Sequence, residues 1–172
     1  MSLVIVGTVA FDAIETPFGK TDKIVGGAAT FAGLSASFWY DNVKLISVIG
    51  EDFGDNINII KNKNIDTEGV EVIEGGKSFF WSGKYHNDMN SRDTLVTELN
   101  VLADFDPKVP ASYNDCEYLL LGNLTPKVQM DTLDRMTTKP KLVVLDTMNF
   151  WMDVALEDLK NGKTIYTIKI DW

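Results

Sequence analysis

The sequence predicts one α/β domain, in which helices cover a mostly parallel sheet and a smaller β segment is inserted. Two observations lead to this prediction. Short aliphatic runs alternate with helical segments on both sides of the insert, which is the rhythm of parallel strands joined by helices. The chain has 172 residues, 45% of them apolar and 24% charged, so it is long enough for one domain, or the larger part of one, with a buried core.

The first half of the chain contains two strands and two helices of this pattern, followed by a third, short strand. Leu3–Val6 is a continuous apolar run closed by a glycine, and Val43–Ile49 is a second such run, both typical of strands buried on two faces. Between them, Ala28–Trp39 is apolar or small nearly all round, which predicts a buried helix. Phe53–Asn62 predicts a further helix and Gly69–Ile73 a short strand.

The inserted segment has a period of two instead of a continuous apolar run, which predicts strands of a small two-sided sheet. We expect its strands within residues 13–25 and 78–99. One face of the later part would carry Phe79, Trp81 and Tyr85, and the other Phe80, Lys84 and His86. A second alternation follows in Leu95, Thr97 and Leu99 against Val96 and Glu98.

The strand–helix pattern returns after Cys116. Tyr118–Leu121 and Leu142–Asp146 predict buried strands. A helix is expected from Pro126, because proline is favoured at the first helical position, and a second over Phe150–Leu159. The tail Thr164–Trp172 predicts one more strand.

Charge and cysteine content restrict the class of protein. The net charge is −9, and lysine and arginine are spread along the chain, whereas a nucleic-acid-binding protein needs a clustered basic surface. The lone Cys116 cannot form an intrachain disulfide, which suits a reducing compartment. No stretch reaches the roughly 18 apolar residues of a membrane span. We expect a cytoplasmic protein that binds neither nucleic acid nor membranes.

Three local features have both a functional and a structural interpretation. Asp12 follows the first strand, at the edge where ligands of open α/β sheets bind, although a solvated loop carboxylate is the simpler interpretation. Gly26 and Gly27 precede a helix and allow close approach of a ligand to the backbone, or form an ordinary turn. Gly50–Gly54 (GEDFG) is an acidic turn in which Asp52 is expected to cap the following helix.

In this order and spacing, the three features resemble the PfkB (ribokinase-like) carbohydrate kinase family. Gly7 with Asp12 is similar to the family's first-strand sugar-binding element, and Gly26-Gly27 to its di-glycine signature. Gly50–Gly54 is similar to a shortened G-x-D-x-F-G element. The inserted β segment lies where the family keeps its lid, and Val143–Trp151 (VVLDTMNFW) resembles a group of bacterial sugar-kinase homologues. The resemblance extends from about residue 3 to residue 159.

The resemblance implies a ribokinase-like αβα sandwich with a small β lid. It also implies an ATP-dependent kinase that phosphorylates a hydroxyl group of a sugar or nucleoside, with ATP and Mg²⁺ in the intact enzyme and a homodimer formed through the lid. The substrate-binding positions would be Asp12, Gly26, Gly27, Phe31 and Asn149. For Asn149 a helix N-cap is the structural alternative. Trp81 and Tyr85 of the lid would either clamp a ligand or lie in the interface between two lids.

Two departures from the family pattern restrict this expectation. Phe31 stands where the di-glycine signature usually carries Asn, so a stacking surface replaces hydrogen-bonding groups. The Gly-rich D-T-x-G-A-G-D element, which supplies the family's catalytic Asp, does not occur, and only Gly122 and Gly162 follow Gly83. We therefore expect residues 1–172 to be the N-terminal portion of one domain, truncated before the ATP-binding half, without catalytic residues or metal ligands and inactive alone. A sugar-binding or structural module without catalysis is the alternative.

Overall fold

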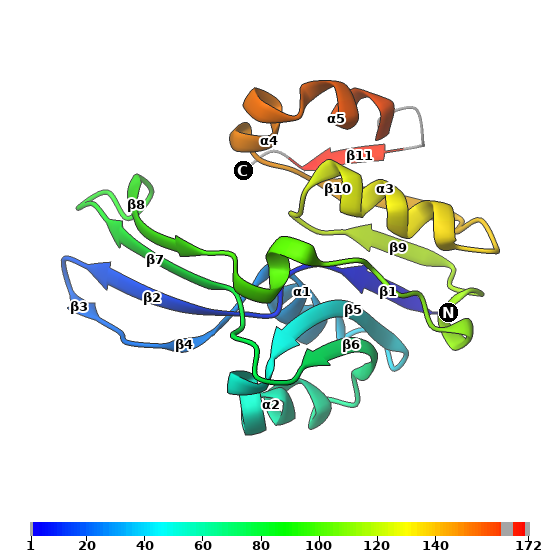
Figure 1. The fold of residues 1–172 in the computed structure, drawn as a ribbon, viewed down its shortest axis with the longest axis horizontal. Coiled ribbons are helices and arrows are strands. Elements are labelled where there is room, and N and C mark those ends of the chain that lie inside the picture. Colours follow the sequence, from blue (N-terminus) through cyan, green and yellow to red (C-terminus); the bar gives the residue numbers. More distant parts are fainter. Residues whose placement is uncertain (1, 163–166, 171–172) are drawn as a thin grey trace.

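The computed structural model describes residues 2–162 and 167–170 and has the predicted α/β architecture (Figure 1). Its main sheet has six strands, all parallel, in the order β11-β10-β9-β1-β5-β6. The strands are β1 (Leu3–Val6), β5 (Val43–Gly50), β6 (Asp66–Ile73), β9 (Tyr118–Leu121), β10 (Leu142–Asp146) and β11 (Thr167–Ile170).

Helices and 3-10 turns cover both faces of the main sheet, which makes the fold a three-layer αβα sandwich. The α-helices are α1 (Ala28–Ala36), α2 (Asn58–Lys61), α3 (Pro126–Arg135), α4 (Asn149–Val154) and α5 (Leu156–Gly162). The 3-10 helices are η1 (Glu51–Ile57), η2 (Asn100–Asp104) and η3 (Ala111–Tyr113). Pro126 is the first residue of α3, as predicted.

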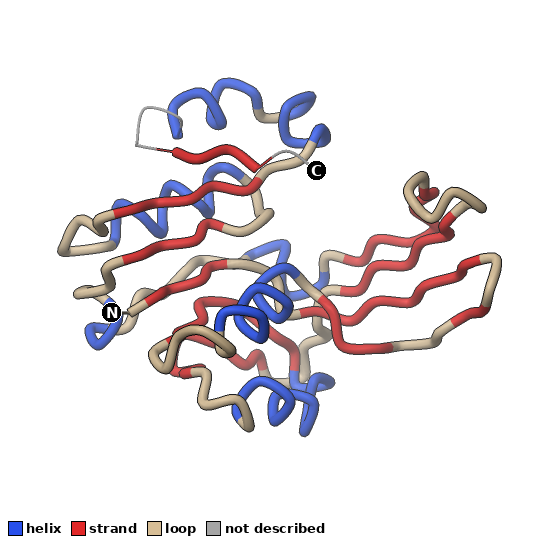
Figure 2. The backbone as a smooth tube through the Cα atoms, turned by 180° about the vertical axis from the view of Figure 1, so that it is seen from behind, coloured by secondary structure: helices blue, strands red, loops and turns tan. Residues whose placement is uncertain are grey.

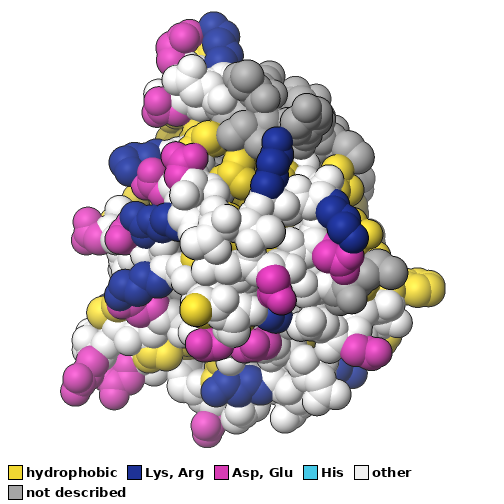
Figure 3. All heavy atoms as spheres, turned by 90° about the vertical axis from the view of Figure 1, so that its right-hand side faces the viewer, with side chains coloured by type: hydrophobic (Ala, Val, Ile, Leu, Met, Phe, Trp, Pro, Cys, Tyr) yellow, Lys and Arg dark blue, Asp and Glu magenta, His cyan; other side chains and the backbone are white. Residues whose placement is uncertain are grey.

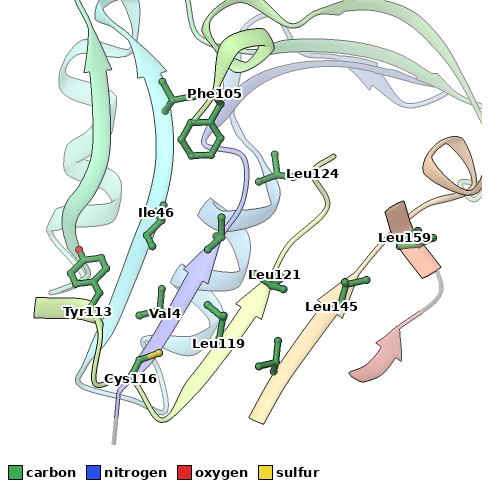
Figure 4. Close-up of a cluster of buried hydrophobic side chains, with 13 residues drawn as sticks. Val4, Ile46, Phe105, Tyr113, Cys116, Leu119, Leu121, Leu124, Leu145 and Leu159 are labelled. Carbon is green, nitrogen blue, oxygen red and sulfur yellow. The ribbon is translucent and has the colours of Figure 1, made fainter. Parts of the chain in front are cut away.

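Alternate residues of β1 belong to two separate cores. Val4 and Val6 pack into a cluster that includes Leu159 of α5 (Figure 4). Ile5 points to the opposite face and packs into a cluster that contains Ala29 of α1 and further side chains from α2 and η1. Because both faces of the strand are buried, its sequence is a continuous aliphatic run without polar alternation.

A second sheet of five strands forms the predicted insert, which we call the lid. Its strands are β2 (Ala10–Thr16), β3 (Gly19–Lys20), β4 (Ile24–Gly26), β7 (Phe80–Tyr85) and β8 (Arg92–Glu98). The order is β3-β2-β7-β8, and β4 pairs with β2. The lid extends away from the main sheet on the side where the main strands end (Figures 1 and 2). It begins at Ala10, three residues before the expected boundary at residue 13.

Several predicted boundaries are wrong for identifiable reasons. The helix expected over Ala28–Trp39 ends at Ala36, and Phe38 and Trp39 are exposed beyond it. A single helix over Phe53–Asn62 does not form, because Gly54 has φ +48° and breaks the helical path within η1, and the α-helix α2 begins only at Asn58. The helix expected over Phe150–Leu159 is divided into α4 and α5 at Ala155, whose backbone leaves the helical region.

The short strand expected at Gly69–Ile73 begins earlier, at Asp66. Of the strand expected over Thr164–Trp172, the part described is β11, which pairs in parallel with β10. The other tail residues of that expectation lie outside the described part of the chain.

The surface carries charges of both signs. On the face in Figure 3, acidic and basic side chains are interspersed over the surface. Several form ion pairs across elements, such as Lys108 with Glu71 at 2.6 Å. Within residues 2–162 and 167–170, no helix is both long and apolar enough to cross a membrane.

Candidate functional site

The carboxyl ends of the main strands meet at one edge of the sheet, and the N-terminus of α1 packs directly on the ends of β1 and β9. Gly7 follows β1 and Gly122 follows β9. A Cβ atom on Gly7 would lie 3.0 Å from the backbone nitrogen of Ala29, and one on Gly122 would lie 2.8 Å from the carbonyl oxygen of Val6 and 3.6 Å from the Cβ atom of Ala28 in α1. Glycine at both positions therefore allows the close approach of helix and sheet.

Thr8 and Gly27 build the start of α1. Gly27 precedes the helix with φ +100°, and a Cβ atom there would lie 2.3 Å from the Thr8 carbonyl oxygen. The Thr8 hydroxyl accepts a hydrogen bond from the Ala28 N–H at 2.9 Å, and the Thr8 carbonyl accepts one from the Ala29 N–H at 2.9 Å. Two donors of the first helical turn are therefore already used by the protein. The sequence analysis did not single out Thr8.

Asp12 lies within strand β2 of the lid, which corrects its expected place in a loop after the first strand. Its backbone is aligned with Ile24 of β4 on one side and with Trp81 of β7 on the other. The neighbouring residue, Phe11, is buried against the ring of Phe53, with the ring centroids 4.9 Å apart. Since side chains alternate along a strand, Asp12 projects from the opposite face of the lid to Phe11.

The Asp12 carboxyl group lies against Gly26. A Cβ atom on Gly26 would lie 2.0 Å from Asp12 Oδ2, so only glycine leaves room for the carboxyl group. Burial raises the pKa of Asp12 above its ordinary value. Among the residues that the structure describes, none forms a hydrogen bond or an ion pair with this side chain. Asp12 is therefore a half-buried acceptor with unused hydrogen-bonding capacity.

Trp81 and Tyr85 lie on the same face of the lid as Asp12. Asp12 pairs directly with Trp81 on the neighbouring strand, and Tyr85 follows Trp81 by four residues, an even number. The Trp81 ring crosses Gly83, where a Cβ atom would lie 2.1 Å from it. The Trp81 indole N–H donates to the Thr94 hydroxyl of β8 at 3.3 Å. Both aromatic rings are half-buried, so they keep accessible surface on the face that carries Asp12.

Phe31 is 59% exposed on the first turn of α1. Its N–H donates to the Gly27 carbonyl oxygen at 3.1 Å. It shares a helix face with Ala28, three residues earlier, and Ala28 is the residue that a Cβ atom on Gly122 would contact at 3.6 Å. Phe31 therefore stands on a side of α1 close to the end of β9, with most of its side chain exposed.

Asn149 stands on the other side of this edge, after β10. It is exposed at the first turn of α4, and the N-cap of that helix is Met148 without a side-chain hydrogen bond, so the alternative role of Asn149 as an N-cap is wrong. The Asn123 amide fixes this segment instead. It donates to the Met148 sulfur at 3.1 Å and accepts from the Trp151 indole N–H at 2.8 Å.

Gln129 of α3 holds the ends of β9 and β10 together. Its side-chain amide donates to the carbonyl oxygens of Gly122 and Asp146, each at 2.8 Å, and the residue is almost completely buried. Neither Gln129 nor Asn123 was singled out from the sequence. Their partners come from other strands, so no local pattern reveals them.

The geometry of this edge does not suit the phosphates of ATP. A phosphate site needs free N–H donors and no neighbouring negative charge, whereas Thr8 occupies two donors of α1 and Asp12 lies beside Gly26. No group of three His, Cys, Asp or Glu residues that could hold a metal ion occurs in the described part of the chain. The Asp12 site instead matches a neutral ligand with hydroxyl groups, which donate hydrogen bonds to a carboxylate.

Comparison with known proteins gives relatives in sequence and in fold. No family model matches the chain. The chain is 29% identical over 147 residues to a cytidine kinase of Thermococcus kodakarensis, an alignment that covers 85% of this chain and 51% of that protein. The chain therefore spans about half the length of this curated relative.

Two solved structures share the fold. The Methanocaldococcus jannaschii nucleoside kinase, an archaeal member of the ribokinase family, superposes with a TM-score of 0.76 at 17% identity, covering 99% of this chain and 60% of its own. The Burkholderia thailandensis nucleoside kinase, solved with inosine and with ADP-inosine, gives 0.76 at 13% identity with the same coverage. These findings confirm the predicted resemblance: the chain has the ribokinase-like αβα fold with its lid, over about three fifths of the length of these kinases.

Proposed function

We propose that this chain is the substrate-binding part of an ATP-dependent kinase that phosphorylates a hydroxyl group of a sugar or nucleoside. The observation that carries the proposal is the Asp12 carboxyl group, which is half-buried against Gly26 without a partner among the described residues. Hydrogen bonds to a charged acceptor contribute roughly 1.5–3 kcal/mol each. A diol such as that of a ribose would supply two donors to one carboxylate.

The remaining site residues have defined parts in this proposal. Gly26 leaves room for the Asp12 carboxyl group, and Gly27 lets the chain turn into α1 beside Thr8, so both shape the site that the ligand would occupy. Phe31 offers an exposed ring on which a flat base stacks, in place of a polar contact to a sugar hydroxyl. Trp81 and Tyr85 cover the ligand from the lid and exclude water, and Asn149 faces it from the end of β10. The likeness to kinases that act on nucleosides supports a nucleoside ahead of a simple sugar.

We further propose that the protein works in the cytoplasm, a reducing compartment that suits its single cysteine. We also propose that two copies associate through their lids, because every residue of the edge strand β8 is exposed. Phosphoryl transfer requires stabilisation of the transferring group and a correctly placed base. The edge around Asp12 supplies a substrate contact and neither of these elements. We therefore expect the 172-residue chain to bind its substrate without turning over ATP.

Calorimetric titration of the chain with a panel of nucleosides and sugars tests the proposal. We expect at least one nucleoside to bind, and Asp12→Ala to weaken that binding roughly tenfold or more, as expected for the loss of at least one hydrogen bond to a charged group. Glu15→Gln is the matched control, since Glu15 lies on the same strand but pairs with Lys84 at 2.7 Å on the opposite face.

Glu15→Gln is expected to leave the affinity unchanged. A coupled ATPase assay with the same panel completes the test, and we expect no turnover above background. Equal affinity in the wild type and in Asp12→Ala would refute the assignment of Asp12. Turnover that follows the purified chain would show that it holds a catalytic base and is more than a binding part.

A further inference from the structure

The turn after β5 carries Asp52, which was expected to cap the following helix. The N-cap of η1 is instead Gly50, without a side-chain hydrogen bond. The Asp52 carboxylate points to segments that are distant in sequence and that belong to the base of the lid. The proposed substrate site does not explain why the GEDFG turn carries a carboxylate at this position.

One oxygen of Asp52 holds the chain just before β7. Asp52 Oδ1 accepts hydrogen bonds from the N–H and from the hydroxyl group of Ser78, both at 2.7 Å. The Ser78 hydroxyl in turn accepts from the Gly50 N–H at 3.0 Å. The Ser78 carbonyl accepts from the side-chain amide of Asn100 at 2.9 Å, just after β8. Both ends of the β7–β8 hairpin are therefore tied to the turn through one buried serine.

The other oxygen of Asp52 holds the opposite side of the lid. Lys23, one residue before β4, places its ammonium group 2.9 Å from Asp52 Oδ2 and 4.0 Å from the centre of the Phe11 ring. Burial acts to raise the pKa of Asp52, but hydrogen bonds from Lys23 and Ser78 outweigh it and lower this pKa below its ordinary value. The lysine and aspartate side chains remain 48% and 26% exposed, so solvent and salt reach the pair.

These contacts connect the Asp52 turn to the substrate site. Lys23 lies three residues before Gly26, and β4, which contains Gly26, pairs directly with the segment of β2 that contains Asp12. We infer that Asp52 and Lys23 are positioning residues, which fix the angle of the lid on the main sheet and thereby hold Gly26 against Asp12. The link to ligand affinity rests on the function proposed above, whereas the link to lid motion does not.

Hydrogen–deuterium exchange of the full chain, followed by mass spectrometry, tests the inference without any ligand. Lys23→Met keeps the aliphatic stem but removes the charge. We expect exchange over residues 14–26 to become about 1.4- to 5-fold faster, the effect of losing one exposed ion pair, and exchange in β1 and β9 to stay unchanged. High salt should produce the same acceleration in the wild type and little further change in the variant.

Lys108→Met is the matched control, because Lys108 forms an ion pair of the same kind with Glu71, at 2.6 Å, but outside the lid. It should leave exchange over residues 14–26 as in the wild type. Asp52→Asn removes the pair and also weakens the two hydrogen bonds from Ser78. It should therefore accelerate exchange at least as much as Lys23→Met, and adding Lys23→Met to it should change nothing further, since the pair is already lost. Equal exchange over residues 14–26 in Lys23→Met and in the control would overturn the inference.

The affinity measurement separates this inference from the proposed function. For a nucleoside that the wild type binds, Lys23→Met should weaken binding by a similar 1.4- to 5-fold, and Lys108→Met should not. Faster lid exchange with unchanged affinity would overturn the positioning role while leaving Asp12 as the ligand contact. Faster lid exchange in a chain that binds no member of the panel would support the anchoring of the lid and count against the substrate proposal.

Discussion

Strand β5 of the main sheet is buried along its whole length, whereas strand β8 of the lid is exposed along its whole length. The first is held by aliphatic packing on two faces. The second is attached to the body of the protein through the hairpin ends and the Asp52 turn. Burial of apolar surface is non-directional and large in sum, whereas a few polar contacts are directional and individually small. The main sheet therefore depends on many packing contacts, whereas the position of the lid depends on a few polar ones.

The largest expected difference between the two sheets is in the free energy of unfolding after the same Val→Ala substitution. Val6→Ala in β1 removes two buried carbon atoms from a residue with no exposed surface and should lower the free energy of unfolding by about 2 kcal/mol. Val96→Ala in β8 acts on a side chain that is 40% exposed and should change it by less than about 0.5 kcal/mol. Chemical denaturation measures both, and similar losses would contradict the contrast.

The sequence alone predicted the main sheet well because each of its strands is a local signal. Leu3–Val6, Tyr118–Leu121 and Leu142–Asp146 form strands with the predicted bounds. Helices were predicted less well. The breaks at Gly54 and at Ala155 each depend on the backbone conformation of one residue, which apolar periodicity does not reveal.

For the candidate site, the sequence suggested individual residues but not how they lie together. Asp12 and Gly26 were both singled out. Their direct contact arises from the antiparallel pairing of β2 with β4, which places the Asp12 carboxyl group where a side chain at position 26 would otherwise lie. Asp52 was assigned to a cap because its true partner, Ser78, lies 26 residues away. Contacts between distant segments of this kind leave no periodic pattern in the sequence.

Substitutions that affect self-association should have an intermediate effect and should act through the lid but not through the body of the protein. Leu95 of β8 is exposed on the edge strand of the lid, and Leu95→Lys should weaken a lid-mediated dimer roughly tenfold, since a charge on an edge strand opposes pairing. Ile59→Lys on α2, where Ile59 is 46% exposed on the body of the protein, is the control. Sedimentation at a series of concentrations measures both, and a wild type that stays monomeric throughout would reject the dimer.

Asp12→Asn should have the smallest effect on stability, and at neutral pH that effect should be a gain. Burial raises the pKa of Asp12, so the native state holds the proton more tightly than the unfolded chain does. The wild type therefore loses stability as pH rises from the ordinary Asp value through the raised one, and the loss is complete above it. Removing the charge should raise Tm slightly at neutral pH, and the gain should vanish at acidic pH.

Paired measurement of Tm and nucleoside affinity in Asp12→Asn, at neutral pH, tests the central claim most directly. If Asp12 is kept for a ligand at a cost in stability, the variant will be slightly more stable than the wild type and bind a nucleoside roughly tenfold or more weakly. If the carboxyl group is instead part of the scaffold, the variant will be less stable and bind as the wild type does, and that result would contradict the account.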